Sequence, residues 1–149
     1  MDIYQDEFFG KWVAHAHIRL FHLLTRKLQK EGFDLTFEQV IMLKVINVNE
    51  GITQQEVATM ISKDKTSVTR AISILEDHHK VVRITAKGDK RKKGLFLTKE
   101  GKEFLKLAIP QIENIRTEFE KVFSKQEMNQ NIDFLKRVIN LTKELEEKL

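Results

Sequence analysis

The feature that most constrains this chain is a pair of nearly identical helix-start signals. In LTFEQVIML, Thr36 stands three residues before Gln39, and in GITQQEVATMI, Thr53 stands three residues before Glu56. A Thr followed at this spacing by Glu or Gln forms a capping box, in which each side chain accepts a hydrogen bond from the other residue's backbone amide. The two signals predict successive helices joined by a short connection, the first of them running to about Val48.

A further helix is predicted after a short break at residues 62–63, with Asp64 as its N-cap. Its apolar residues recur at i, i+3, i+4 and i+7, which indicates one buried stripe: Val68, Ala71, Ile72 and Leu75. At 100° per residue the opposite side carries Thr66, Arg70, Ser73 and Asp77, flanked by Ser67 and Thr69. A short helix, a tight turn and a second helix thus occur in order. The outward side of the second helix carries mainly small hydroxyls and one Arg.

Two apolar runs follow, VVRIT and LFLT, and each predicts a strand. The segment between them, Ala86 to Gly94, is predicted to be the loop of a hairpin.

Positive charge is concentrated in this part of the chain, because residues 80–93 hold seven Lys or Arg against one acid. Residues 1–79 carry a net −2 and residues 94–149 a net 0, within a total of +4. The whole positive excess lies in one segment, which indicates a surface that faces a polyanion.

Long helices are predicted on both sides of this region. The first covers about residues 5–31 and ends at Gly32, and its apolar residues lie on more than one side, which indicates a second partner. One group of aromatic residues in this helix is interpreted as dimer core rather than a ligand pocket: Phe8, Phe9, Trp12 and Phe21. Thr98 caps a helix to about Phe123 with a kink or break expected at Pro110, and a last helix covers about 125–149.

The predicted fold is mainly α with a small β-hairpin wing. A winged helix-turn-helix at 33–98 lies between an N-terminal dimerisation helix at 1–32 and C-terminal dimerisation helices at 99–149. The second helix of such a motif fits the major groove of DNA, which is about 12 Å wide. The hairpin of a winged helix reaches along the duplex, where its cations contact phosphates and an Arg at its tip enters a narrow minor groove.

The residues expected to contact DNA follow from this arrangement. On the helix they are Lys65, Thr66, Ser67, Thr69, Arg70 and Ser73, and on the wing Lys87, Asp89, Lys90, Arg91, Lys92 and Lys93. Arg70 could bind a guanine edge with two hydrogen bonds. Asp89 is acidic and is expected to orient Arg91 through a charge-assisted hydrogen bond.

These stretches resemble the MarR family of winged-helix regulators. The resemblance rests on LTFEQVIML, GITQQEVATMI, DKTSVTRAISILE, VVRI and above all DKRKKGLFLTKEG, which is similar to the family's D-x-R … L-T-x-x-G wing signature. It implies a homodimer whose first and last helices interlock and whose recognition helices enter successive major grooves of a pseudo-palindromic operator. It also implies a regulator of transcription, by family habit a repressor. The family often binds small aromatic acids, so an effector of that class is expected.

One position departs from the family pattern. The family usually has Gly where this chain has His79. A residue other than Gly at a left-handed helix end is costly but tolerated. His79 in place of Gly is expected to affect the angle between the recognition helix and the wing.

Other functions are less well supported by the residues. The chain has no Cys, no Gly-rich phosphate loop and no His-Glu metal motif, which argues against an enzyme. His15, His17 and His22 leave a metal site open, although partly buried structural histidines are the favoured interpretation. No apolar run is long enough to span a membrane and the acidic N-terminus has no signal-peptide core, so a cytoplasmic protein without cofactor is expected. The alternative is a winged-helix interaction module without specific DNA binding, although the outward helix face is neither acidic nor apolar.

Overall fold

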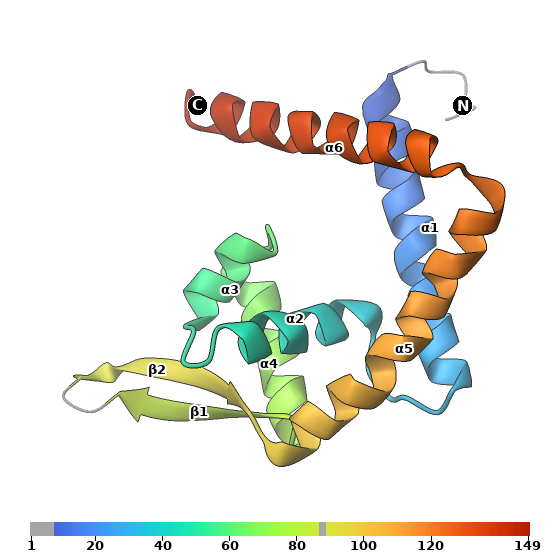
Figure 1. Cartoon of the computed structure of the whole chain (residues 1–149). Helices are drawn as coiled ribbons and strands as arrows, with labels where there is room; N and C mark the ends of the chain where they lie inside the picture. Colours follow the sequence, from blue (N-terminus) through green and yellow to red (C-terminus); the bar gives the residue numbers. More distant parts are fainter. Residues whose placement is uncertain (1–7, 87–88) are drawn as a thin grey trace, which may run out of the picture. The chain divides into compact units, whose positions relative to one another are not determined.

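The computed structural model describes residues 8–86 and 89–149. Within these ranges the chain forms six α-helices and one antiparallel pair of strands (Figure 1). In chain order they are α1 (Phe9–Lys30), α2 (Phe37–Val48), α3 (Gln54–Met60), α4 (Lys65–Asp77), β1 (Val81–Ala86), β2 (Asp89–Leu97), α5 (Lys99–Val122) and α6 (Lys125–Glu146). The mainly α fold with a β-hairpin wing is thereby confirmed. No helix in these ranges is long and apolar enough to cross a bilayer.

The chain divides into two compact units, Met1–Ile112 and Glu113–Leu149, and helix α5 belongs to both. This division reflects which parts of the chain are compact. The boundaries predicted from the sequence, 1–32, 33–98 and 99–149, separate parts by their roles in dimerisation and DNA binding. Those predicted boundaries stay a prediction. Helix α5 contains Pro110 within an uninterrupted run, so the break considered at that residue does not occur.

The core of the larger unit is formed by one side of each helix that belongs to it and by the inner face of the wing. In α4 the predicted stripe is buried, since Val68, Ile72 and Leu75 expose no surface, and Ala71 is partly covered. The partners of this stripe include Leu28, Leu35, Val40, Met42, Leu43, Ile46, Ile52, Val57, Val81, Leu95, Leu97, Leu105 and Ala108. Because α4 buries this side, its opposite side is left for solvent or a partner.

The two helix starts have the geometry that the sequence predicts. The amide of Gln39 donates to Thr36 Oγ1 at 3.3 Å, and the amide of Thr36 donates to Gln39 Oε1 at 2.8 Å. The same pair of bonds joins Thr53 and Glu56, at 3.3 and 2.8 Å. Both capping boxes are therefore confirmed, and each satisfies two backbone groups that would otherwise lack a partner.

Three helices end with a residue in the left-handed region. These residues are Gly32, Ser62 and His79, with φ of 86°, 54° and 54°. At the end of α4 the amide of His79 donates to the carbonyl of Glu76, and the amide of Lys80 donates to that of Leu75, both at 2.8 Å. These are the paired bonds of a Schellman motif. His79 thus adopts the conformation for which Gly is preferred, as the family pattern at this position indicates.

The wing is joined to the helix-turn-helix at its base. The amide of Gly51 donates to the carbonyl of Leu95 at 2.9 Å, and the amide of Leu95 donates to Ile52 at 2.8 Å. The backbones approach so closely here that a Cβ on Gly94 would lie 2.8 Å from the Gly51 carbonyl oxygen. Only Gly fits at that position without displacing the chain.

The basic segment is a strand rather than a loop. Strand β1 continues through Ala86 and β2 begins at Asp89, so only residues 87–88 lie between them. Lys93 pairs with Thr85 and Gly94 with Ile84, and the register shifts between Thr85 and Ala86. The prediction of a loop from Ala86 to Gly94 is therefore wrong. The β-branched residues of β1 favour extended pairing, and cross-strand packing overrides the low strand preference of Lys in β2.

Candidate DNA-binding surface

The recognition helix α4 begins at a cap formed by Asp64. The amide of Ser67 donates to Asp64 Oδ1 at 2.8 Å, and the Ser67 hydroxyl donates to Oδ2 at 2.6 Å. The hydroxyl and then the amide of Ser67 stabilise the charged carboxylate and lower the pKa of Asp64 below its usual value. The cap fixes the start of α4, and the orientation of its first turn with it.

Two side-chain contacts hold the segment around α4 at its two ends. Lys63, just before the cap, lies 3.3 Å from Glu38 at the start of α2. His78, just after the last helical residue, places Nδ1 2.7 Å from the Asp34 carboxylate. With the buried stripe in the core, these contacts determine which side of α4 is presented outward.

Three of the predicted helix contacts have no side-chain partner among the described residues. Lys65, Thr66 and Arg70 are exposed. Within residues 8–86 and 89–149 their side chains make no hydrogen bond or ion pair. Thr66 and Arg70 lie on the side of α4 opposite the buried stripe. Lys65 lies in the first turn, three residues before Val68 and on the same side as it. Two cations and one hydroxyl are thus available to an anionic partner.

The other three predicted helix contacts already donate their hydroxyl protons within the chain. Ser67 donates to Asp64, Thr69 donates to the Lys65 carbonyl at 2.8 Å, and Ser73 donates to the Thr69 carbonyl at 3.0 Å. Thr69 and Ser73 are also half-buried. Their oxygen atoms can still accept hydrogen bonds. The roles of all six residues toward DNA stay a prediction.

The wing continues this surface along β2. The backbone of Asp89, Lys90, Arg91, Lys92 and Lys93 lies in the strand, and the Lys93 side chain is exposed. The side chains of 89–92 and the whole of Lys87 lie outside the described part of the structure. The expected hydrogen bond between Asp89 and Arg91 therefore stays a prediction.

Sequence reasoning missed the ion pair that connects the recognition helix to the wing. Arg83 of β1 lies 3.2 Å from the carboxylate of Glu76 on α4, and both side chains are mostly covered. The Nε and Nη2 atoms of Arg83 are buried without a hydrogen-bond partner. The sequence did carry a signal for this contact. Residues two apart in a strand lie on the same face, so Arg83 shares a face with the apolar Val81. That face is the one expected to turn toward α4.

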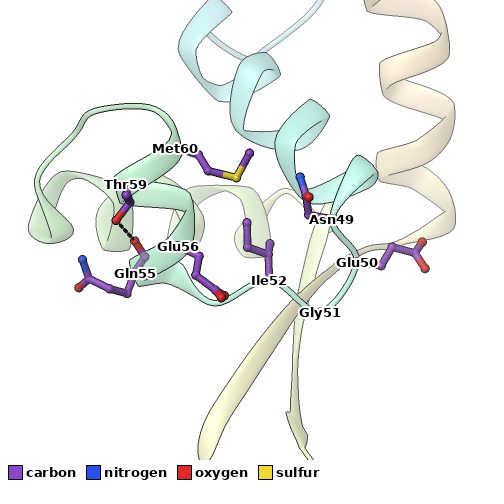
Figure 2. Close-up of a pocket in the computed structure, with 8 residues that line it drawn as sticks. All are labelled: Asn49, Glu50, Gly51, Ile52, Gln55, Glu56, Thr59 and Met60. Atoms are coloured by element: carbon purple, nitrogen blue, oxygen red, sulfur yellow. Dashed lines mark hydrogen bonds between the residues drawn. The ribbon is translucent and has the colours of Figure 1, made fainter. Parts of the chain in front are cut away.

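A hollow at the corner between α2 and α3 lies close to the wing base. It has a volume of about 620 Å³ and is lined by Asn49, Glu50, Gly51, Ile52, Gln55, Glu56, Thr59 and Met60 (Figure 2). Its two carboxylates serve the fold. Glu50 pairs with Lys102 at 2.7 Å, and Glu56 completes the capping box with Thr53. The hollow is assigned no ligand.

The histidines of α1 are exposed rather than partly buried. His15, His17 and His22 all face solvent in the single chain, which corrects the expectation of structural, partly covered rings. Among the residues that the structure describes, no three His, Cys, Asp or Glu side chains are grouped closely enough to hold a metal ion. His17 instead lies against Phe21, with ring centroids 4.1 Å apart.

A second hollow lies between α1 and the start of α2. This aromatic hollow has a volume of about 520 Å³ and is lined by His17, Ile18, Phe21, His22, Thr25, Arg26, Thr36 and Glu38. The Phe21 ring also contacts Phe37 edge-on, with centroids 4.9 Å apart. The hollow combines an apolar wall with the side chains of one Arg and two His.

The helix-turn-helix and its attached hairpin define a winged-helix protein. Residues 33–92 match the model of the MarR family. The transcriptional regulator HosA of Escherichia coli is 27% identical over 126 residues, which cover 85% of this chain and 93% of HosA. The transcriptional repressor MprA of Escherichia coli is 22% identical over 144 residues, covering 97% of this chain and 82% of MprA. The winged-helix part of the chain is thus similar to the regulators of the MarR family.

The fold is also that of solved structures. The MepR–DNA complex of Staphylococcus aureus matches with a TM-score of 0.82 at 19% identity, over 92% of this chain and 99% of that one. At this identity the likeness concerns the fold. It places the elements α3, α4, β1 and β2 in the arrangement of a winged helix.

Proposed function

We propose that this protein is a sequence-specific, double-stranded-DNA-binding transcriptional regulator that acts as a homodimer. The observation that carries the proposal is the first half of α4, where Thr66 and Arg70 on the outward side and Lys65 in the first turn are exposed and unpaired among the described residues. Two nearby acids are engaged with other cations, Glu38 with Lys63 and Glu76 with Arg83. Asp64 caps the helix through Ser67, and Asp77 stands at its far end. Lys65 and Arg70 have no ion pair among the described residues, and they lie on the element that a winged helix inserts into DNA.

The proposed contacts divide by chemistry. Arg70 reads a base edge, because a guanidinium can donate two parallel hydrogen bonds to guanine in the major groove. Lys65 and Lys93 are compact cations at the start of α4 and on the wing strand, and they bind phosphates. Phosphate contacts set position and salt dependence, whereas base contacts set sequence preference.

A homodimer follows from the apolar residues that the single chain leaves exposed. Near the start of α1, Phe8, Phe9 and Trp12 expose about half of their surface or more. Helix α6 has no buried residue, although Ile132, Leu135 and Ile139 form a stripe at helical spacing. Apolar area of this extent on two helices is typical of an interface. A symmetric pair of recognition helices then matches a pseudo-palindromic operator.

Regulation by a ligand is the second part of the proposal. A repressor of this kind is released when an effector changes the spacing of its two recognition helices. The sequence assigned Phe21 to the dimer core, but its ring lines the aromatic hollow beside Ile18. A small aromatic acid fits there, since these two side chains supply an apolar wall and Arg26 a partner for a carboxylate. We expect the protein to act in the cytoplasm, where the operator is accessible, and to act by binding rather than by catalysis.

The test is fluorescence anisotropy with a duplex selected from a random library and a scrambled duplex of equal length, at two salt concentrations. A specific regulator prefers the selected duplex by about a thousandfold or more, and its affinity falls steeply with salt. Equal and weak binding to both duplexes, with little salt dependence, would instead favour the winged-helix interaction module.

A further inference from the structure

Helix α1 carries several cations that pair with no acid among the described residues. Between His15 and Lys30 there are four Lys or Arg and no Asp or Glu. The next three acids along the chain are engaged elsewhere: Glu31 with Lys27 at 3.2 Å, Asp34 with His78 at 2.7 Å and Glu38 with Lys63 at 3.3 Å. Arg19, Arg26 and Lys30 are left without an ion pair in the part of the chain that the structure describes.

These three cations lie along one side of the helix. Arg26 and Lys30 lie seven and eleven residues after Arg19, which places each within about 20° of Arg19 around the helix. They flank a hollow of about 510 Å³ that we call the cationic groove, lined by Arg19, His22, Leu23, Arg26, Lys27 and Lys30. Arg19 and Lys30 are separated by about 16 Å along the helix axis. Several negative groups fit along that length.

The cationic groove is continuous with the aromatic hollow. His22 and Arg26 line both. On the other side of these two residues lie Ile18 and the Phe21 ring, which is packed against His17 and Phe37. Glu38, the acid in the hollow, is held by Lys63. One site thus has an apolar, ring-lined end and a cationic end.

We propose that the groove and the hollow together bind an organic polyphosphate, with its ring in the aromatic hollow and its phosphates along the cationic groove. A monocarboxylate would pair with Arg26 and leave Arg19 and Lys30 uncompensated. Guanidinium groups bind phosphate oxygens with two parallel hydrogen bonds, which makes Arg the residue best suited to this ligand. Each hollow has a volume in the range of small-molecule sites, about 300–1,000 Å³.

The site is connected to the helix-turn-helix through its wall. The amide of Phe37 donates to Thr25 Oγ1 at 3.1 Å, so the first residue of α2 is bonded to the wall of the hollow. From there α2 leads into the core that supports α4. That the ligand regulates DNA binding rests on the proposed function, whereas the binding of the ligand to this site does not.

The test is isothermal titration calorimetry of the full chain with magnesium-free ATP as probe, without DNA and at constant ionic strength. The double variant R19Q/K30Q removes two groove cations that do not line the aromatic hollow. The control K65Q/R70Q removes the same charge from α4. We expect ATP to bind R19Q/K30Q at least tenfold more weakly than the unmodified chain and the control, with all three proteins folded and dimeric. Equal affinity in all three, or a loss only in the control, would overturn the proposal.

Two further probes separate the ends of the ligand. Inorganic tripolyphosphate lacks the ring and benzoate lacks the phosphates, so each is expected to bind at least tenfold more weakly than ATP. If tripolyphosphate bound as tightly as ATP, the ring would contribute nothing to binding, and the proposed placement of a ring in the aromatic hollow would be wrong. No binding of ATP would overturn the site, while the anisotropy experiment would still decide whether the protein is a DNA-binding regulator.

Discussion

Arg70 has the position that a base-reading residue needs. It is exposed at the centre of the outward side of α4, with no ion pair in the described ranges, while Ile72 and Leu75 fix the opposite side in the core. A bidentate contact between Arg and guanine contributes about 1–3 kcal/mol of discrimination. We therefore expect Arg70→Ala to lower affinity for the selected operator about tenfold to a hundredfold, and to relax base preference at one position in each half-site.

Lys44→Ala is the matched control for this substitution. It removes one cation at an exposed position of α2 that is not among the expected DNA contacts, so little affinity depends on it. Binding to operators changed at single base pairs, measured by anisotropy, would detect the relaxed position. An unchanged base preference in Arg70→Ala would show that another residue reads the base.

The cap of α4 makes a stability contribution that depends on pH. The pKa of Asp64 is lowered in the folded chain by the Ser67 hydroxyl and then by the Ser67 amide, from an ordinary value of 3.8. A lowered pKa means that this stabilisation is fully present above pH 3.8 and is lost as the pH falls through the folded pKa. Asp64→Ala should therefore lower Tm at pH 7, and the difference from the unmodified chain should shrink below pH 3.8.

Asp64→Asn separates the cap from the charge. Asn caps helices about as well as Asp and does not titrate, so its Tm at pH 7 should stay close to that of the unmodified chain. Thermal unfolding followed by circular dichroism from pH 7 to pH 3 is the measurement. A difference between Asp64→Ala and the unmodified chain that stays constant over this range would contradict the assignment.

At the scale of single elements, the helix-turn-helix could be predicted and the wing only in part. Helix starts are local, because Thr36 with Gln39 and Thr53 with Glu56 carry their own signal within four residues. The strand β2 is not local. Its basic residues have low strand preference, and they pair because β1 lies beside them. The left-handed residue at the end of α4 is partly predictable. The family pattern has Gly at the position of His79, which indicates a left-handed conformation there, and the φ of His79 is 54°.

The end of α4 at His79 is a strained position that a substitution can relieve. A side chain in the left-handed region costs about 1–2 kcal/mol, partly offset by the lower entropy of its unfolded chain compared with Gly. We expect His79→Gly to stabilise the fold by about 0.5–1 kcal/mol, seen as a higher urea midpoint with unchanged slope. Ile74→Gly, at an exposed position in the interior of α4, is the control and should destabilise the protein, because Gly within a helix is unfavourable.

The ion pair between Glu76 and Arg83 determines how the wing is placed relative to α4. Arg83 already has two buried nitrogen atoms without a partner, so loss of the Glu76 carboxylate leaves an unpaired guanidinium. We expect Glu76→Gln to misplace the wing and to reduce the salt dependence of DNA binding, by about one in the log–log slope for each phosphate that the wing no longer binds. Affinity should fall severalfold although the net charge becomes more positive.

Glu100→Gln changes the net charge equally and removes only a 3.8 Å pair with Lys80, so it is the control. Anisotropy over a series of salt concentrations gives the slope for each protein. If Glu76→Gln and Glu100→Gln had the same slope as the unmodified chain, the pair would be structural only.

On the scale of the whole molecule, the sequence predicts the surface that a second copy needs but not its geometry. The apolar residues of α1 on several sides, and of α6 at helical spacing, indicate a partner because one chain cannot cover them. The cationic groove was not predicted. Its residues are spread over three turns of α1, and their lack of partners depends on ion pairs formed by Glu31, Asp34 and Glu38 in the folded chain.

Ile139 tests the dimer most directly. It exposes 52% of its surface and lies between Leu135 and Leu145 on α6, where no residue is buried within the chain. In a symmetric dimer each substitution occurs twice, so Ile139→Asp places two carboxylates in the interface. We expect at least a hundredfold increase in the dimer dissociation constant by analytical ultracentrifugation. Asn140→Asp adds the same charge at the next, polar position and should leave the dimer intact.

Since only a dimer holds two recognition helices, Ile139→Asp should weaken binding to a two-site duplex far more than to a duplex with one half-site. Equal loss on both duplexes would mean that α6 supports the fold of the single chain and not the dimer.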